Sequence, residues 1–202
     1  MAKIDWKKDL KHLYLPKSKE FTLVDVPPMR FLMVDCHGDP NTSPEFQDVM
    51  SALYTMAYSL KFAVKPQGTD FAVPPPEALW WMEGVEFDSR DKSKWDWTLM
   101  IMVPDVVTPE LFERMRAEAQ RKKGLPMLAK VRLETYHEGL SAQILYFGPY
   151  ADEGPTITAM HQFIAEQGYV LNGKHHEIYL GDPRKAAPEK LKTVIRQPVR
   201  KP

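Results

Sequence analysis

Apolar residues recur every three or four positions in three segments of this chain, which predicts three amphipathic helices. The expected ranges are 45–60, 108–123 and 155–167. Ser43 and Thr108 each precede a Pro-Glu pair at the start of the first two helices, so both are the expected N-caps. Glycine follows the second and third helices, where a left-handed C-terminal residue is common.

Short apolar or alternating runs, bounded by Gly, Pro and Asp, predict strands between these helices. The expected strands are 31–37, 78–83, 96–103, 141–147, 175–180 and 192–199. Pro198 has no N–H for a strand ladder, so the last strand is expected at a sheet edge. The order strand, helix, strand, strand therefore occurs twice along the chain.

The repeated order predicts an α+β fold built from a duplicated β-α-β-β module. Gly38 aligns with Gly148, and Leu79 aligns with Ile178. We expect a pseudo-twofold antiparallel sheet with helices on one face and a ligand cleft at the junction of the repeats. The expected parts are an N-terminal arm over 1–20 and one domain over 21–202, with a first repeat at about 21–105, a connector helix at about 108–124 and a second repeat at about 128–202.

Strand alternation assigns the side chains of 175–180 to two faces. Ile178 and Leu180 are apolar, so we expect them to face the helices. Glu177 and Tyr179 then lie on the cleft face, and the repeat alignment makes Trp80 the counterpart of Tyr179. A carboxylate between aromatic walls attracts cationic aromatic ligands and, when desolvated, suits acid–base chemistry. The alternative is that Glu177 is a solvated strand residue.

The composition and charge of the chain argue against several classes of function. The 202 residues contain 27 Lys and Arg against 27 Asp and Glu, which argues against a nucleic-acid partner bound by bulk charge. No apolar run approaches the roughly 20 residues of a membrane helix, and a lone cysteine, Cys36, suits the cytoplasm. We interpret a basic C-terminal stretch as a solvated edge and tail; its residues are Lys185, Lys190, Lys192, Arg196, Arg200 and Lys201.

Several motifs, in order along nearly the whole chain, resemble stand-alone GyrI-like small-molecule-binding proteins. The segments are KKDLKHLYLP (7–16), VDVP (24–27), DCHGDPN (35–41), EALWW (77–81), HEIYLGDPR (176–184) and PEKLKT (188–193). The resemblance implies the duplicated fold that also serves as the effector-binding domain of multidrug-sensing regulators. It implies binding of bulky, often cationic, aromatic compounds around a glutamate that matches Glu177.

Some members of that family are associated with hydrolysis of strained cyclopropane groups in DNA-alkylating natural products. For this chain the resemblance implies Glu177 as the base that activates water, and Tyr179 or Tyr146 as donors to the substrate carbonyl. Trp80 and Trp97 are the expected aromatic walls. The alternatives are a receptor that sequesters such toxins without turnover, or a protein that modulates DNA gyrase.

Other chemistry has little support in the sequence. His175 and Glu177 share a strand face, but no third ligand has suitable spacing, so we expect no metal site. No glycine-rich phosphate loop occurs, and we expect no cofactor.

Overall fold

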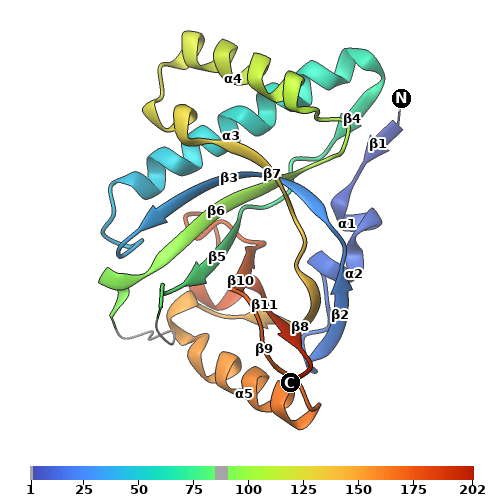
Figure 1. The fold of residues 1–202 in the computed structure, drawn as a ribbon, viewed down its shortest axis with the longest axis vertical. Coiled ribbons are helices and arrows are strands. Elements are labelled where there is room, and N and C mark those ends of the chain that lie inside the picture. The colour runs from blue at the N-terminus through green and yellow to red at the C-terminus, as the bar shows by residue number, and fades with distance from the viewer. Residues whose placement is uncertain (1, 85–90) are drawn as a thin grey trace. The chain divides into compact units, whose positions relative to one another are not determined.

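The computed structural model describes residues 2–84 and 91–202, and the chain forms two compact units. Unit 1 comprises Met1–Asp5 and Met29–Tyr136, and unit 2 comprises Trp6–Pro28 and His137–Pro202. Each unit combines helices with an antiparallel sheet, so the predicted α+β class is confirmed (Figure 1). Within the described residues, no helix is both long and apolar enough to span a membrane.

Unit 1 contains a sheet with the strand order β5-β6-β3-β7. Its elements are β1 (Ala2–Ile4), β3 (Met29–His37), α3 (Glu45–Val64), the 3-10 turn η1 (Lys65–Gln67), β4 (Thr69–Phe71), β5 (Glu77–Trp81), η2 (Lys92–Lys94), β6 (Asp96–Val103), α4 (Pro109–Lys123), η3 (Pro126–Lys130) and β7 (Arg132–Tyr136). Outside this sheet, β1 pairs in parallel with β4. Figure 1 shows α3 and α4 packed together beside β3 and β6.

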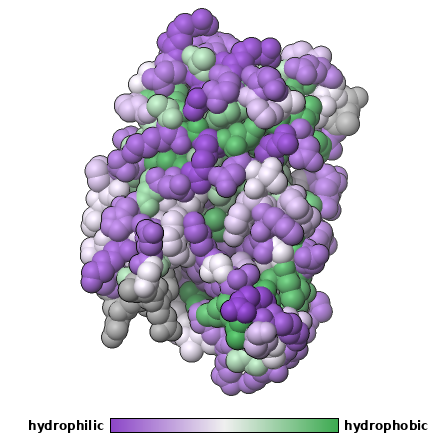
Figure 2. Space-filling model, in the orientation of Figure 1, coloured by the Kyte–Doolittle hydropathy of each residue, from purple (hydrophilic) through white to green (hydrophobic). Residues whose placement is uncertain are grey.

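The helices of unit 1 follow the apolar pattern closely. Every third or fourth residue of α3 is buried, from Val49 to Val64, which gives the helix one apolar face. Thr108 caps α4 by accepting a hydrogen bond from the backbone N–H of Leu111, and Gly124 ends the helix in the left-handed region with φ of 60°. Figure 2 shows hydrophilic residues over the outer side of α4, at the top of that view.

Ser43 does not cap α3 as predicted. The N-cap position is Pro44, and no side chain accepts a hydrogen bond there. Ser43 instead closes a turn, because its backbone N–H donates to the Asp39 carbonyl. The helix start is therefore set by the Asp39 turn and by proline.

Unit 2 contains a sheet with the strand order β10-β11-β8-β2, and β9 pairs with the end of β11. Its elements are α1 (Trp6–Asp9), α2 (Lys11–Tyr14), β2 (Thr22–Val26), β8 (Gly139–Phe147), η4 (Tyr150–Asp152), α5 (Gly154–Glu166), β9 (Val170–Leu171), β10 (His175–Tyr179), η5 (Pro188–Lys190) and β11 (Lys192–Arg200). The strand β11 lies between β8 and β10, so the predicted edge position is wrong. Pro198 is tolerated because it stands near the strand end, opposite Ser141.

The two units share strand order and register. The equivalent cross-strand rows are Ala78–Leu99–Val34 in unit 1 and Glu177–Ile195–Ile144 in unit 2. The outermost strands come from distant parts of the chain. In unit 1 the outermost strand is β7, which follows α4 in the chain. In unit 2 it is β2, which comes before β3, the first strand of the β-α-β-β segment of unit 1. Each β-α-β-β segment is thus completed by a strand from outside its own stretch of sequence.

Candidate functional site

The strand β10 places Glu177 and Tyr179 on one face of the unit 2 sheet. Glu177 pairs with Ile195, which pairs with Ile144, and directly paired residues point to the same face. Ile144 and Ile195 belong to one apolar cluster with residues of α5. Glu177 therefore lies on the sheet face that α5 covers.

This arrangement reverses the predicted faces of β10, although the alternation itself holds. The same reversal occurs in unit 1, where Trp80 contacts Trp97, and Trp97 lies 5.7 Å from the Phe46 ring of α3. The prediction assumed that only one sheet face is covered. In unit 2 the face opposite α5 is also buried, because Arg196 on that face contacts the carbonyl of Leu13 in α2.

Glu177 is a largely buried carboxylate that contacts two other side chains of β10. Tyr179 Oη donates to Glu177 Oε2 at 2.7 Å, and His175 Nε2 lies 3.2 Å from Oε1. About 13% of the Glu177 side chain is exposed. Burial alone raises the pKa of a carboxyl group, but the contacts with His175 and Tyr179 outweigh it and hold the pKa of Glu177 below its usual value. Glu177 is therefore ionised at neutral pH.

Glu153 is a second carboxyl group beside Glu177, and the sequence analysis missed it. It stands at the N-cap of α5, is 3% exposed, and makes a side-chain hydrogen bond with Glu177. Burial, reinforced by the negative charge of Glu177, raises the pKa of Glu153 to about 9. An acidic residue at a helix start is common, so only its burial marks it as unusual, and no sequence signal reveals that.

Tyrosine rings surround the two carboxyl groups. Tyr150 meets Tyr179 edge to face at 5.3 Å, and burial together with the nearby acids raises the pKa of Tyr150 to about 12. Tyr146 donates to the Pro149 carbonyl at 3.3 Å, and its hydroxyl lies over Gly148, where a Cβ atom would collide with it. Three phenol groups thus line one acidic site.

The predicted tryptophan walls lie in unit 1. Trp97 is fully buried and donates from Nε1 to the Gly38 carbonyl at 2.9 Å. Trp80 is 7% exposed, and its ring lies 6.1 Å from Trp97. The structure thus brings together Trp80 and Trp97 in one unit, and Tyr146, Glu177 and Tyr179 in the other.

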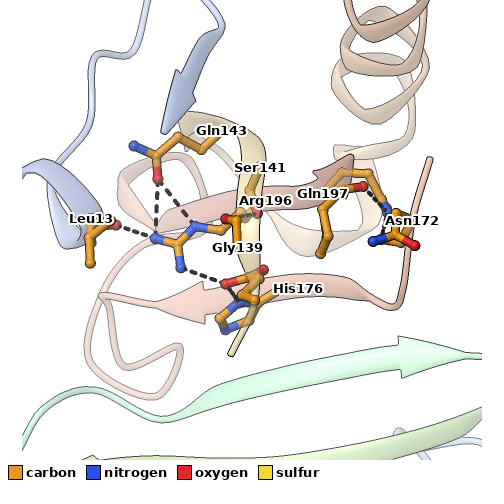
Figure 3. A network of polar contacts seen from close by, with 10 residues as sticks. Leu13, Gly139, Ser141, Gln143, Asn172, His176, Arg196 and Gln197 are labelled. Atoms are coloured by element: carbon orange, nitrogen blue, oxygen red, sulfur yellow. Dashed lines mark hydrogen bonds and ion pairs between the residues drawn. The ribbon is translucent and has the colours of Figure 1, made fainter. Parts of the chain in front are cut away.

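A second polar cluster in unit 2 is completely buried (Figure 3). Arg196 donates to Glu138, to Gln143 and to the Leu13 carbonyl, while His176 Nδ1 lies 3.0 Å from both Glu138 oxygens. Burial opposes ionisation of Glu138, but the charges of His176 and Arg196 lower its pKa to about 2. The predicted solvated role of Arg196 is wrong, since it is the internal partner of Glu138.

Other candidate chemistry is limited in the part of the chain that the structure describes. No three His, Cys, Asp or Glu side chains come together there as metal ligands would. Burial raises the pKa of Cys36 to about 11, which makes it a poor nucleophile. A surface groove of about 500 Å³ runs along α2 and β2, lined by Lys8, Lys11, His12, Leu15, Pro16, Lys17, Thr22, Leu23, Val24 and Gln143. Glu153 and Glu177 do not line it.

Comparisons with known proteins identify the family. A model of the GyrI-like small molecule binding domain matches residues 19–200. An uncharacterized conserved protein from Listeria innocua is 41% identical with a TM-score of 0.91, and the match covers 98% of this chain and all of that one. Two crystal structures described as hydrolases from Listeria innocua are 40% and 38% identical, with TM-scores of 0.88 and 0.85 and the same coverage. No curated protein matches. The chain belongs to the GyrI-like small-molecule-binding family.

Proposed function

We propose that this protein binds flat aromatic small molecules and hydrolyses a strained cyclopropane ring in them, with Glu177 as the base that activates water. One observation carries the proposal: Glu177 is a desolvated carboxylate kept ionised by His175 and Tyr179. The hydrolase descriptions of two relatives near 40% identity support a reaction in addition to binding.

The surroundings of Glu177 suit a bulky amphipathic aromatic ligand. The rings of Tyr150 and Tyr179 offer apolar and aromatic surface next to the carboxylate. A negative charge in a site of low polarity attracts a cationic or strongly polarised ligand more than the same charge in water. The same groups therefore favour both the binding of such a ligand and its orientation beside Glu177.

The chemistry is the addition of water to the ring. Glu177 accepts a proton from water while the water oxygen bonds to a cyclopropane carbon. The ring carbon–carbon bond breaks, and its electron pair moves into the conjugated carbonyl of the substrate. Tyr179 donates to Glu177 at 2.7 Å, so we assign it to holding that carboxylate. We assign Tyr146, whose hydroxyl makes only a long hydrogen bond of 3.3 Å to the Pro149 carbonyl, as the donor that turns to the carbonyl oxygen of the substrate.

A multiple-turnover assay tests the proposal. An excess of an aromatic spirocyclopropyl dienone is mixed with catalytic protein, and the product with one added water is followed by mass spectrometry. We expect many turnovers by the wild type and a loss of at least about 100-fold in Glu177→Gln. Glu166→Gln is the matched control, because Glu166 is an exposed residue of α5 outside the site.

The assay also separates the alternative function. Retention of one unchanged equivalent of the dienone per protein would show a receptor that sequesters the compound. Full activity of Glu177→Gln would show that this carboxylate is not the base.

A further inference from the structure

We propose that Glu153 is the proton donor of this reaction, so that Glu153 and Glu177 work as an acid–base pair sharing one proton. The inference rests on the proposed function and adds a second catalytic group to it. It assigns the proton that the substrate oxygen takes up when the ring opens.

The geometry of Glu153 supports this role. Its carboxyl group lies beside Glu177 and beside the hydroxyl of Thr193, and its buried Oε1 atom makes no hydrogen bond of ordinary geometry. The buried hydroxyl of Thr193 lies beside Glu153, but it makes no hydrogen bond of ordinary geometry. Unpartnered polar atoms inside a protein cost free energy and are uncommon, and they are found where a ligand completes the contacts. Glu153 and Thr193 thus present a donor and an acceptor to a bound molecule.

The charges around Glu153 favour its neutral form. The groups that act on Glu153 are Glu177 from β10 and Thr193 from β11, and those that act on Glu177 are Glu153, His175 and Tyr179. The negative charge of Glu153 in turn acts on Tyr146 and Tyr150, with Asp152 and Asp182 nearby. Lys and Arg are absent from these groups. Two carboxyl groups whose pKa values are driven apart divide naturally into an acid and a base. Glu153 holds the proton, and Glu177 carries the charge.

The proton balance closes without any further reactant. Glu177 takes a proton from the attacking water as the new carbon–oxygen bond forms. The electron pair of the broken ring bond reaches the carbonyl oxygen, and that oxygen takes the proton of Glu153. One proton then passes from Glu177 to Glu153 along their hydrogen bond. The pair returns to its starting state, and the substrate has gained one water.

The variant Glu153→Gln tests the proposal, because glutamine keeps a neutral hydrogen-bonding side chain but cannot release a proton. We expect kcat on the spirocyclopropyl dienone to fall about 100-fold while binding, measured by tryptophan fluorescence, changes less than threefold. Wild-type activity should also fall above pH about 9, and the residual activity of Glu153→Gln should not show that decline.

Two results overturn the proposal. A folded Glu153→Gln variant with wild-type kcat and an unchanged alkaline limb would show a merely structural role. A wild type that leaves the dienone unchanged would instead remove the proposed function, and the acid–base pair with it. The two results are distinguishable in the wild type. The first leaves wild-type turnover of the dienone intact and removes only the role of Glu153, whereas the second is an absence of turnover by the wild type itself.

Discussion

Arg196 shows how much one buried charge matters to unit 2. Its guanidinium is fully buried and is the partner of Glu138, Gln143 and the Leu13 carbonyl. Arg196→Leu leaves the Glu138 charge beside His176 alone, so we expect a loss of about 3–5 kcal/mol in the free energy of unfolding, measured with urea.

Two further variants test the stability prediction for Arg196→Leu, one as a matched control and one as a rescue. Arg200→Leu changes an exposed arginine on the same strand and should alter stability by less than about 0.5 kcal/mol. The double variant Arg196→Leu, Glu138→Leu removes both charges and should recover part of the loss. Equal stability of Arg196→Leu and Arg200→Leu would contradict the internal role of Arg196.

The same cluster makes the folded state of unit 2 less stable at acid pH. The pKa of Glu138 is about 2 in the folded protein against 4.5 as its ordinary value. A lowered pKa stabilises the folded state above the ordinary value, and this contribution is lost as the pH falls from about 4.5 towards 2. The loss amounts to about 3 kcal/mol. Urea unfolding at pH 6, 4 and 3 should show this decline, and Glu138→Gln should flatten it.

The shifted pKa of Glu153 changes the stability with pH in the opposite direction. Its pKa is raised from 4.5 to about 9, so the folded state holds a proton that the unfolded state releases between these values. The stabilising contribution is complete below pH 4.5 and is lost as the pH rises towards 9. Glu153→Gln carries no such proton, so it should be more stable than the wild type at pH 8 by at least about 1 kcal/mol, and no more stable at pH 4. Chemical unfolding at both values measures this, and a less stable variant at pH 8 would contradict it.

At the scale of elements, the cap of α4 is a local signal with a local effect. Thr108 Oγ1 accepts from Leu111 at 3.2 Å, and this is the contact that its sequence position predicts. Thr108→Ala should cost about 1 kcal/mol, measured by thermal unfolding. Thr158→Ala, at an exposed position inside α5, should cost clearly less.

Elements governed by such local chemistry were predictable from the sequence. The start and end of α4, the apolar face of α3 and the alternation in β10 all follow from residues close together in the chain. The face to which β10 turns Glu177 was not predictable, because it depends on which segments cover each side of the sheet. Arg196 was misread for the same reason: a charged residue looks solvated until a distant carboxylate and the Leu13 carbonyl are placed beside it.

The candidate site likewise contains residues that could be predicted from the sequence and one that could not. Glu177 and Tyr179 were found from alternation and family resemblance, and the structure joins them by a hydrogen bond. Their catalytic role stays a prediction. Glu153 was missed because nothing in residues 148–155 distinguishes a buried acid from an ordinary helix-capping one.

At the scale of the whole molecule, unit 2 is assembled from both ends of the sequence. β2 pairs with β8, and α2 contributes buried Leu13 and Tyr14. We therefore expect residues 137–202 alone to lack cooperative unfolding. Joining residues 6–28 to them through a flexible linker should restore it, as measured by circular dichroism during urea unfolding. Cooperative unfolding of 137–202 alone would show that the N-terminal segment is dispensable.

The contact between Arg196 and Leu13 also orders events during synthesis. The two residues are 183 positions apart, so α2 leaves the ribosome long before its partner is translated. Until then Tyr14 can pack only against nearby residues such as Trp6, whose ring lies 5.1 Å from its own in the folded protein. Unit 2 can close around Leu13 only after β11, which supplies Arg196, has been translated. The contacts that bury Leu13 in unit 2 therefore form only after 183 further positions have been translated.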